Sequence, residues 1–240
     1  MKGFINCDIG EGAGNDALLI PLIQAANIAC GFHAGSPAII RETVGLCIRH
    51  GVAIGAHPSF NDRAHFGRLE MNLQEKELYE LISRQLDAFY RVTREFGVNP
   101  VHVKPHGALY NMCARDRAVA AVVANAVKDF DSTLILYGLS GSIALDEAER
   151  LGLKTARESF ADRTYQDDGS LTPRSQPGAT ISDADTVVRQ VMQMIRSGTV
   201  TSISGKIIPL QIDTICIHGD GPHAVDFARA ISQSLKSTDE

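Results

Sequence analysis

Short runs of apolar residues alternate with longer amphipathic runs along the whole chain. Short apolar runs bounded by Gly, Pro or polar residues are typical of buried strands, whereas apolar residues spaced three and four apart are typical of helices. The pattern predicts strands at residues 3–9, 26–30, 52–56, 101–104, 133–136, 154–158 and 214–217. It predicts helices at residues 16–24, 37–50, 72–97, 115–128, 142–151, 183–196 and 222–235.

Residues that favour helix ends support several of these boundaries. Ser36 and Pro37 suit the N-cap and first position of the second helix, and Gly51 suits its end. Asn72, with Glu75 three residues later, has the spacing of a capping box at the start of the third helix.

The strand–helix units follow one another without a linker, which predicts one domain over residues 1–240 with an inserted hairpin near residues 200–212. Such alternation builds a parallel sheet, either open or closed. Titratable residues stand at or just beyond the ends of most strands: Asp8, His57, Lys104, His106, Glu158 and His218. An open sheet collects ligand contacts mainly at one switch point, so this distribution favours a barrel whose loops converge on one site.

Composition narrows the class of protein. The chain has 240 residues, 44% hydrophobic and 21% charged, so it can form a sizeable core and is not a disordered sequence. Its formal net charge is −5 without a basic run, so we expect no nucleic-acid partner and no attraction to anionic membranes. The apolar stretches are too short to span a bilayer and the N-terminus lacks a signal-peptide pattern, so we expect a cytoplasmic location.

Neither the cysteines nor the glycine-rich segments carry a recognisable site. The five cysteines are widely spaced without a C-x-x-C pair, which predicts buried apolar residues rather than disulfides or a cysteine zinc site. The glycines of residues 10–14 lack the spacing of a dinucleotide loop. Ile207 follows Gly205-Lys206 where a P-loop has Ser or Thr, so no Walker A loop is predicted to hold ATP.

Histidines follow several strands beside Gly or Pro. His33, His57 and His106 occupy equivalent positions after successive strands. One such histidine is more often structural than functional, but three at equivalent positions favour a function, and the neighbouring Gly and Pro let a substrate approach the backbone. His218 and Asp220 follow the last strand, where Asp220 is also a candidate N-cap of the next helix.

A second group of polar residues follows the sixth strand. Glu158, Asp162 and Arg163 lie at its end, and an exposed ion pair is the simpler interpretation of them. The following loop, residues 159–180, is long for a compact α/β fold, and long loops are often lids. It also carries Arg174, and arginine pairs well with carboxylate or phosphate groups.

Six motifs in order give the chain a resemblance to a known family: INCDIGEG from residue 5, ANIACGFHAG from 26, GAHP from 55, HVKPHGALYN from 102, FADR from 160 and HGD from 218. Through them the chain resembles the LamB/YcsF family over essentially its whole length. The resemblance implies a seven-stranded (β/α) barrel of the glycoside hydrolase/deacetylase type. It also implies the A subunit of an ATP-dependent 5-oxoprolinase, which opens 5-oxoproline to L-glutamate while ATP is hydrolysed to ADP and phosphate, in a complex with subunits B and C.

Lactam opening suggests roles for the residues in these motifs. Phosphorylation of the carbonyl oxygen creates a leaving group, and the site then needs cations for charged oxygens, a base for water and an acid for the ring nitrogen. The catalytic candidates are Asp8, Glu11, His33, His57, Lys104, His106, Glu158, Asp162, His218 and Asp220. The substrate-binding candidates are Asn6, Asn27, Arg163 and Arg174. Phe4 and Ser36 depart from the family pattern, so neither receives a site role.

Two other functions are compatible with the sequence. A metal-dependent deacetylase acting alone would use Asp8, His33 and His57 as its best three ligands, although no H-x-x-x-H pair is present. A non-catalytic subunit would use the barrel only to scaffold its partners, although the density of strand-end titratable groups argues against it. A divalent metal is therefore an open expectation alongside ATP.

Overall fold

Seven parallel strands close into a barrel in the structure, a computed structural model that describes residues 5–236. The strands are β1 (Ile5–Ile9), β2 (Ala25–Ala29), β3 (Ala53–His57), β4 (His102–Val103), β5 (Ile135–Leu139), β6 (Lys154–Phe160) and β9 (Thr214–His218). β9 pairs with both β6 and β1, which closes the ring. The seven-stranded barrel predicted from the sequence is confirmed. Gly3 and Phe4, which belong to the first predicted strand, lie outside the described residues.

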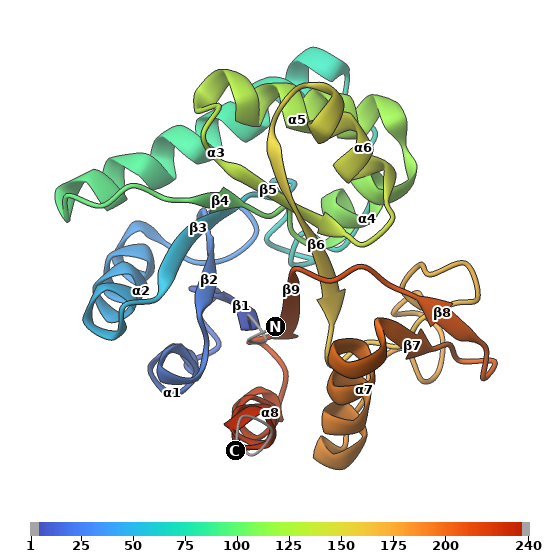
Figure 1. Cartoon of the computed structure of the whole chain (residues 1–240). Helices are drawn as coiled ribbons and strands as arrows, with labels where there is room; N and C mark the ends of the chain where they lie inside the picture. The colour runs from blue at the N-terminus through green and yellow to red at the C-terminus, as the bar shows by residue number, and fades with distance from the viewer. Residues whose placement is uncertain (1–4, 237–240) are drawn as a thin grey trace.

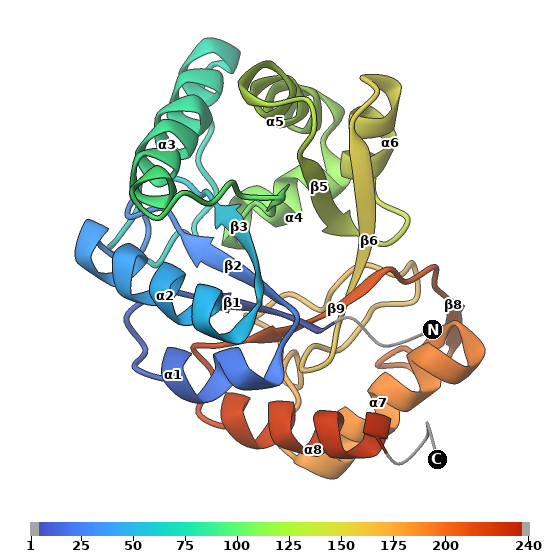
Figure 2. The ribbon, with the colours of Figure 1, turned by 60° about the vertical axis from the view of Figure 1, so that its left-hand side comes forward.

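Helices form the outer layer around the strands (Figure 1, Figure 2). They are α1 (Asp16–Leu19), the short 3₁₀ helix η1 (Ile20–Leu22), α2 (Pro37–His50), α3 (Glu75–Glu95), α4 (Gly107–Arg115), α5 (Arg117–Phe130), α6 (Ile143–Arg150), α7 (Ala184–Ser197) and α8 (Ala224–Lys236). Each amphipathic helix buries one stripe; in α7 the buried residues are Val187, Val191 and Met194, at helical spacing. The Ser36 hydroxyl accepts the backbone N–H of Ile39, as its predicted N-cap role requires.

The first and third predicted helices have different boundaries in the structure. The segment predicted as 16–24 is a short α1 followed by η1, and β2 already begins at Ala25, because Pro21 sits within η1 and cannot donate a backbone hydrogen bond. The third helix does not start at Asn72. Gln74 is its N-cap, and its backbone N–H donates to Glu77 Oε2 over 3.0 Å.

The region after β4 contains two helices where the sequence predicted one. α4 begins at Gly107, directly after His106, and ends at Arg115. Asp116 then leaves the helical conformation, and its carboxylate accepts the backbone N–H groups of Ala118 and Val119 to cap α5. A single Asp between two helical runs therefore acts as a breaker and a cap.

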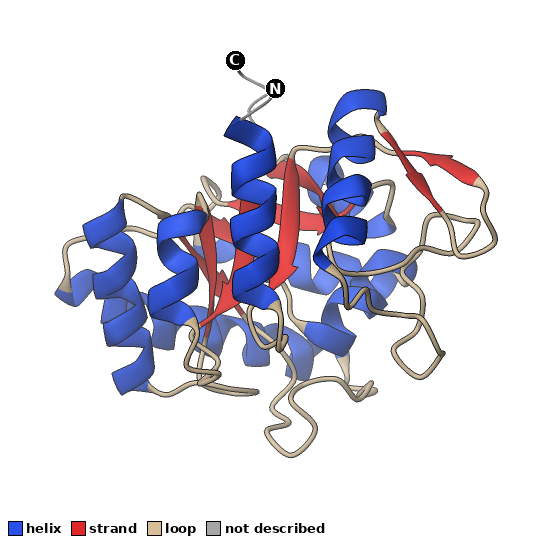
Figure 3. Cartoon of the chain, turned by 90° about the horizontal axis from the view of Figure 1, so that it is seen from below, coloured by secondary structure: helices blue, strands red, loops and turns tan. Residues whose placement is uncertain are grey.

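Between α7 and β9 the chain forms a small antiparallel pair, β7 (Thr199–Thr201) and β8 (Ile207–Pro209). This pair lies outside the ring of helices, beyond α7 (Figure 1, Figure 3). In the part of the chain that the structure describes, no helix is long and apolar enough to cross a membrane.

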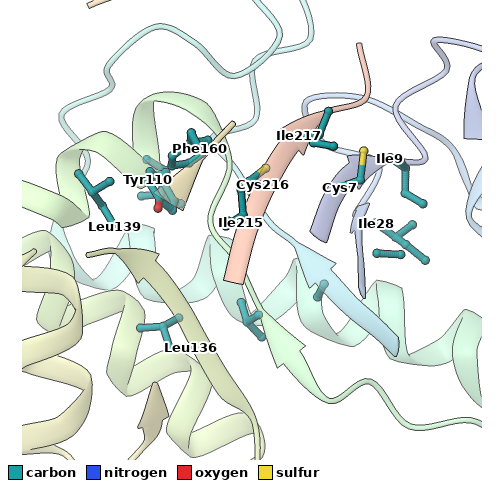
Figure 4. Packing of buried hydrophobic residues seen from close by; sticks show 14 of the residues in the cluster. Cys7, Ile9, Ile28, Tyr110, Leu136, Leu139, Phe160, Ile215, Cys216 and Ile217 are labelled. Atoms are coloured by element: carbon teal, nitrogen blue, oxygen red, sulfur yellow. The ribbon is translucent and has the colours of Figure 1, made fainter. Parts of the chain in front are cut away.

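The strands separate apolar from polar side chains. Cys7 and Ile9 of β1 and Ile28 of β2 are buried in the hydrophobic core, where Figure 4 shows them close together. The intervening residues Asn6 and Asp8 contact residues of other strands across the inside of the barrel. All five cysteines are buried and free, as the sequence predicts.

Candidate active site

A cavity of about 880 Å³ opens where the strands of the barrel end. Its walls include residues from four strand ends and from α4: Asp8, Lys104, His106, Tyr110, Phe160 and His218. The ring of Tyr110 packs edge-on against Phe160 with centroids 5.6 Å apart (Figure 4). The cavity therefore lies at the end of the barrel where parallel α/β folds place their active sites.

Lys104 lies between two carboxylates at the base of this cavity. Its Nζ is 2.8 Å from Asp8 Oδ1 and 2.9 Å from Glu158 Oε1, and its side chain is only 2% exposed. Burial disfavours the ammonium form, but Asp8, Cys216 and Glu158 together outweigh burial, and the pKa of Lys104 is raised well above its ordinary value. Burial also disfavours ionised Asp8, but His57 and Lys104 hold the pKa of that carboxyl well below its usual range.

A hydrogen-bonded chain inside the barrel fixes Asp8 from below. Asn27 Nδ2 donates to Asp8 Oδ1 over 2.8 Å and to Asn6 Oδ1 over 2.6 Å. His102 Nε2 lies 2.8 Å from Asn27 Oδ1, and Asn6 Nδ2 donates to Thr214 Oγ1. Neither asparagine lines the cavity, so the structure gives Asn6 and Asn27 a positioning role, and substrate binding by them stays a prediction.

Asp162 and His218 form a second pair, with His218 in register with Asp8 on the neighbouring strand. Nδ1 of His218 is 2.9 Å from Asp162 Oδ1, and the backbone N–H of His218 donates to Asp162 Oδ2 over 3.2 Å. Burial raises the pKa of Asp162, but the contacts with His218 outweigh it and the net pKa is lowered. The carboxylate thus orients the imidazole and leaves its Nε2 available to a ligand in the cavity.

Three imidazoles and a carboxylate converge beside Asp8. Glu11, His33, His57 and His106 each place one ligand atom within 4.8 Å of all the others, so together these residues could hold a metal ion. Glu11 Oε1 lies 3.3 Å from both His33 Nε2 and His106 Nδ1. Burial lowers the pKa of His33 to about 2 and that of His106 well below its ordinary value, which favours the neutral rings that metals require.

A strained turn after β3 completes this cluster. Phe66 has φ 57°, the only positive φ of a residue other than Gly in the described part of the chain. Its carbonyl oxygen is 2.9 Å from His106 Nε2. Gly67 follows with φ 63°, and a Cβ there would overlap Ser59 Oγ. Backbone strain of this kind persists where the surroundings enforce it, often at functional sites.

The two loop arginines have different surroundings. Arg163 is buried, and its guanidinium donates to the carbonyl oxygens of Thr172 over 2.5 Å and Ala179 over 3.1 Å. Through these hydrogen bonds Arg163 connects two distant parts of its own loop. Arg174 is exposed, lines the cavity and has no hydrogen-bond or ion-pair partner among the residues that the structure describes.

Asp220 pairs with Arg68, which lines the cavity, and does not lie at a helix end. Its Oδ2 accepts from Arg68 Nη2 over 2.5 Å, and α8 begins only at Ala224. The N-cap role predicted for Asp220 is therefore wrong, because the turn that follows β9 separates it from the helix.

The structure brings most of the predicted residues together but regroups them. The metal triple Asp8, His33 and His57 is not the set that converges: Glu11 and His106 join the two histidines, while Asp8 contacts Lys104 and, at 3.4 Å, only His57 of that set. Arg68 and Tyr110 also line the cavity, and neither is among the residues predicted from the sequence. Tyr110 stands within the HVKPHGALYN motif, but α4, which carries it, was not predicted; nothing in the sequence around Arg68 marked it.

Known proteins are similar to this chain over nearly its whole length. Its sequence matches the LamB/YcsF family over residues 4–240. It is 51% identical over 237 residues to the 5-oxoprolinase A subunit of Bordetella pertussis, covering 97% of this chain and 94% of that protein. It is 49% identical over 240 residues to the protein of the same name from Staphylococcus carnosus, covering 98% and 95% respectively.

A solved structure has the same fold. The lactam utilization protein from Thermus thermophilus superposes with a TM-score of 0.93 at 42% identity, over 100% of this chain and 98% of that one. Agreement in sequence and fold over the full length leaves no part of the described barrel without a counterpart. The chain belongs to the LamB/YcsF family.

Proposed function

We propose that this chain is the A subunit of an ATP-dependent 5-oxoprolinase that works in the cytoplasm together with subunits B and C. The reaction opens the lactam ring of 5-oxoproline to L-glutamate while ATP is hydrolysed to ADP and phosphate. The observation that carries the proposal is the identity of about half of all residues with proteins named as the A subunit of 5-oxoprolinase. The name of the Thermus thermophilus relative, a lactam utilization protein, supports the same substrate class.

The buried ammonium of Lys104 supports the lactam chemistry. As the amide carbonyl is activated and attacked, negative charge develops on its oxygen and on any transferred phosphoryl group. A preorganised cation in a site that excludes water stabilises that charge strongly. Asp8 and Glu158 keep Lys104 charged and hold its Nζ at the base of the cavity.

The Asp162–His218 pair supports the proton transfers. His218 is oriented through Nδ1 by Asp162, so its Nε2 can take a proton from the attacking water and return one to the ring nitrogen. Phe160 stacks on the His218 ring with centroids 5.4 Å apart and limits its rotation. The pair therefore supplies the general base and general acid of ring opening.

Arg174 is the better candidate to bind the carboxylate of 5-oxoproline. Its guanidinium faces the cavity without a protein partner among the described residues, whereas that of Arg163 is engaged by loop carbonyls. A planar guanidinium pairs bidentately with a carboxylate. Closure of loop 159–180 would bring this group over the substrate.

A reconstitution assay tests the proposal. The chain is purified alone and with subunits B and C, and L-glutamate and phosphate are measured with 5-oxoproline and ATP. We expect stoichiometric glutamate and phosphate from the complex and little from the chain alone, because its sequence has no recognisable nucleotide loop. A complex that contains Lys104→Met is the control. Glutamate formation by the isolated chain without ATP would contradict the proposal and favour a stand-alone amidohydrolase.

A complex that keeps full activity with Lys104→Met would instead favour the scaffold alternative. In that case the chemistry would lie in the partner subunits, and this barrel would only hold them together.

A further inference from the structure

We propose that Glu11, His33, His57 and His106 bind one divalent metal ion of the zinc class. This inference goes beyond the proposed reaction, since it concerns a metal ion bound by four side chains and not the substrate. The four ligand atoms converge within 4.8 Å, and all four side chains are buried beside the cavity.

Hydrogen bonds to backbone carbonyls fix the tautomers of two of the rings. Nδ1 of His57 lies 2.7 Å from the carbonyl oxygen of Lys104, and a carbonyl can only accept, so this nitrogen carries the proton. The Nε2 of neutral His57 is then a bare lone pair. Nε2 of His106 lies 2.9 Å from the carbonyl of Phe66, so Nδ1 of neutral His106 is also bare.

These two bare nitrogens face each other at 2.9 Å. Two lone pairs at that separation repel unless a cation, either a proton or a metal ion, lies between them. Lone pairs oriented by hydrogen bonds from the far side of each ring are the usual arrangement of metal-binding histidines, in which outer carbonyls set the tautomer.

Glu11 distinguishes a metal ion from a shared proton. A proton on the line between His57 and His106 satisfies two atoms, but Glu11 Oε1 also approaches His106 Nδ1 at 3.3 Å and His33 Nε2 at 3.3 Å. Its side chain is 3% exposed, and within 4.0 Å its only basic neighbours in the described part of the chain are the three histidines. A metal ion at the centre of the four side chains would contact this oxygen and the ring nitrogens at once, which a proton on the line between His57 and His106 would not.

Four of the six separations among the ligand atoms lie near those of a tetrahedral site, and all six are within 4.8 Å. Ligand atoms around a tetrahedral metal lie about 1.6 bond lengths apart, which for zinc–nitrogen bonds of about 2.0–2.1 Å is about 3.3–3.4 Å. The contacts of Glu11 Oε1 at 3.3, 3.3 and 3.9 Å and the His57–His106 contact of 2.9 Å bracket that value. Three imidazole ligands favour zinc and its neighbours over magnesium or calcium, which prefer oxygen.

His33 is the least firmly held of the four ligands. Its Nδ1 is buried without a hydrogen-bond partner among the described residues, and its ring is held by stacking on His106 with centroids 4.0 Å apart. Because no carbonyl fixes its tautomer, loss of His33 weakens metal binding less than loss of His57.

The test measures zinc in the purified chain rather than turnover. Wild type, Glu11→Gln, His33→Ala and His57→Ala are incubated with zinc, dialysed and analysed for metal content. His50→Gln removes an exposed histidine on α2 and serves as the control. We expect one zinc per chain in wild type and control, partial retention in His33→Ala, and loss in Glu11→Gln and His57→Ala. A cobalt-loaded wild-type chain should show the visible absorption of a tetrahedral site.

A second measurement uses only the wild type, in case a variant does not fold. Its thermal unfolding midpoint is determined with and without zinc. A rise in the midpoint on adding zinc, reversed by a chelator, supports the site. Folded wild-type chain that retains no zinc and shows no shift overturns it, and so does equal zinc retention by His57→Ala. A chain that binds zinc in a complex that does not open 5-oxoproline would refute only the proposed function.

Discussion

The Nζ of Lys104 lies 2.8 Å from Oδ1 of Asp8, and both side chains are at most 4% exposed. The two residues are separated by 96 positions in the sequence, and the second partner of the lysine, Glu158, comes from yet another strand. One buried cation thus contacts two carboxylates from different strands, so the same group affects both the stability of the barrel interior and the chemistry of the cavity.

Replacement of this lysine should therefore affect both activity and stability. We expect Lys104→Met to lower the turnover of the complex by about 100-fold or more, because one preorganised charge is worth about 2.7–4 kcal/mol in a transition state. Unlike an exposed lysine, it should also lower the free energy of unfolding by about 3–5 kcal/mol, because two buried carboxylates lose their partner. Steady-state rates and denaturant unfolding measure the two effects. A fully stable, fully active variant would remove Lys104 from both roles.

Asp162→Asn should reduce the rate without removing the fold. The amide can still contact His218, but it no longer stabilises the imidazolium or selects the tautomer with Nε2 free, so we expect turnover to fall by about 100-fold or more. The matched control is Asp167→Asn, an exposed carboxylate on the same loop that contacts Ser202 and Ser204. Equal rates for the two variants would exclude Asp162 from proton transfer.

Arg174 and Arg163 should give different kinetic signatures. Arg174→Lys is expected to raise the KM for 5-oxoproline more than that for ATP, because lysine cannot pair bidentately with a carboxylate. Arg163→Lys should instead loosen loop 159–180 and make it more sensitive to proteolysis, since the loop loses the hydrogen bonds to Thr172 and Ala179. The opposite result, with Arg163→Lys acting only on the KM for 5-oxoproline, would assign carboxylate binding to Arg163 instead of Arg174.

His102 should contribute a pH-dependent part of the stability. Burial lowers its pKa to about 3, whereas in the unfolded chain it titrates near its ordinary value of about 6.5. Between these values the unfolded state binds one more proton, so stability is present above pH ~6.5 and is lost as the pH falls toward ~3. In that window His102→Gln should reduce the slope of unfolding free energy against pH by about 1.4 kcal/mol per pH unit. An unchanged slope, measured by urea titration at several pH values, would contradict the shift.

Gly67 should tolerate substitution less well than other glycines with positive φ. At Gly67 an added Cβ overlaps Ser59 Oγ, whereas at Gly152, with φ 81°, it meets nothing within 4 Å. Gly152→Ala should cost about 1–2 kcal/mol from backbone conformation alone. Gly67→Ala should cost more, and it should displace the Phe66 carbonyl from His106. Equal unfolding midpoints for the two variants would show that the turn relaxes freely.

The sequence by itself determined the strand–helix alternation and the face on which the polar residues lie. In β1 and β4 the period of two places Asn6 with Asp8, and it predicts His102 on the same face as Lys104, whatever the rest of the chain does. Capping of α2 by Ser36 is equally local, because the hydroxyl needs only the backbone three residues ahead. These features depend only on residues close to one another in the chain, so they can be predicted from the sequence.

Only the tertiary structure decided which polar residue meets which. Asp8 contacts both Lys104 and His57, and Glu11 and His106 gather around His33 and His57. Arg163 lines the cavity but donates to carbonyl oxygens of its own loop. The barrel register sets Asp8 level with Asn27 on one side and His218 on the other, and these contacts join residues far apart in the sequence. A buried charge loses its hydration, and only a close and well-oriented partner offsets that loss. Such partners come together only when the ring of strands has closed.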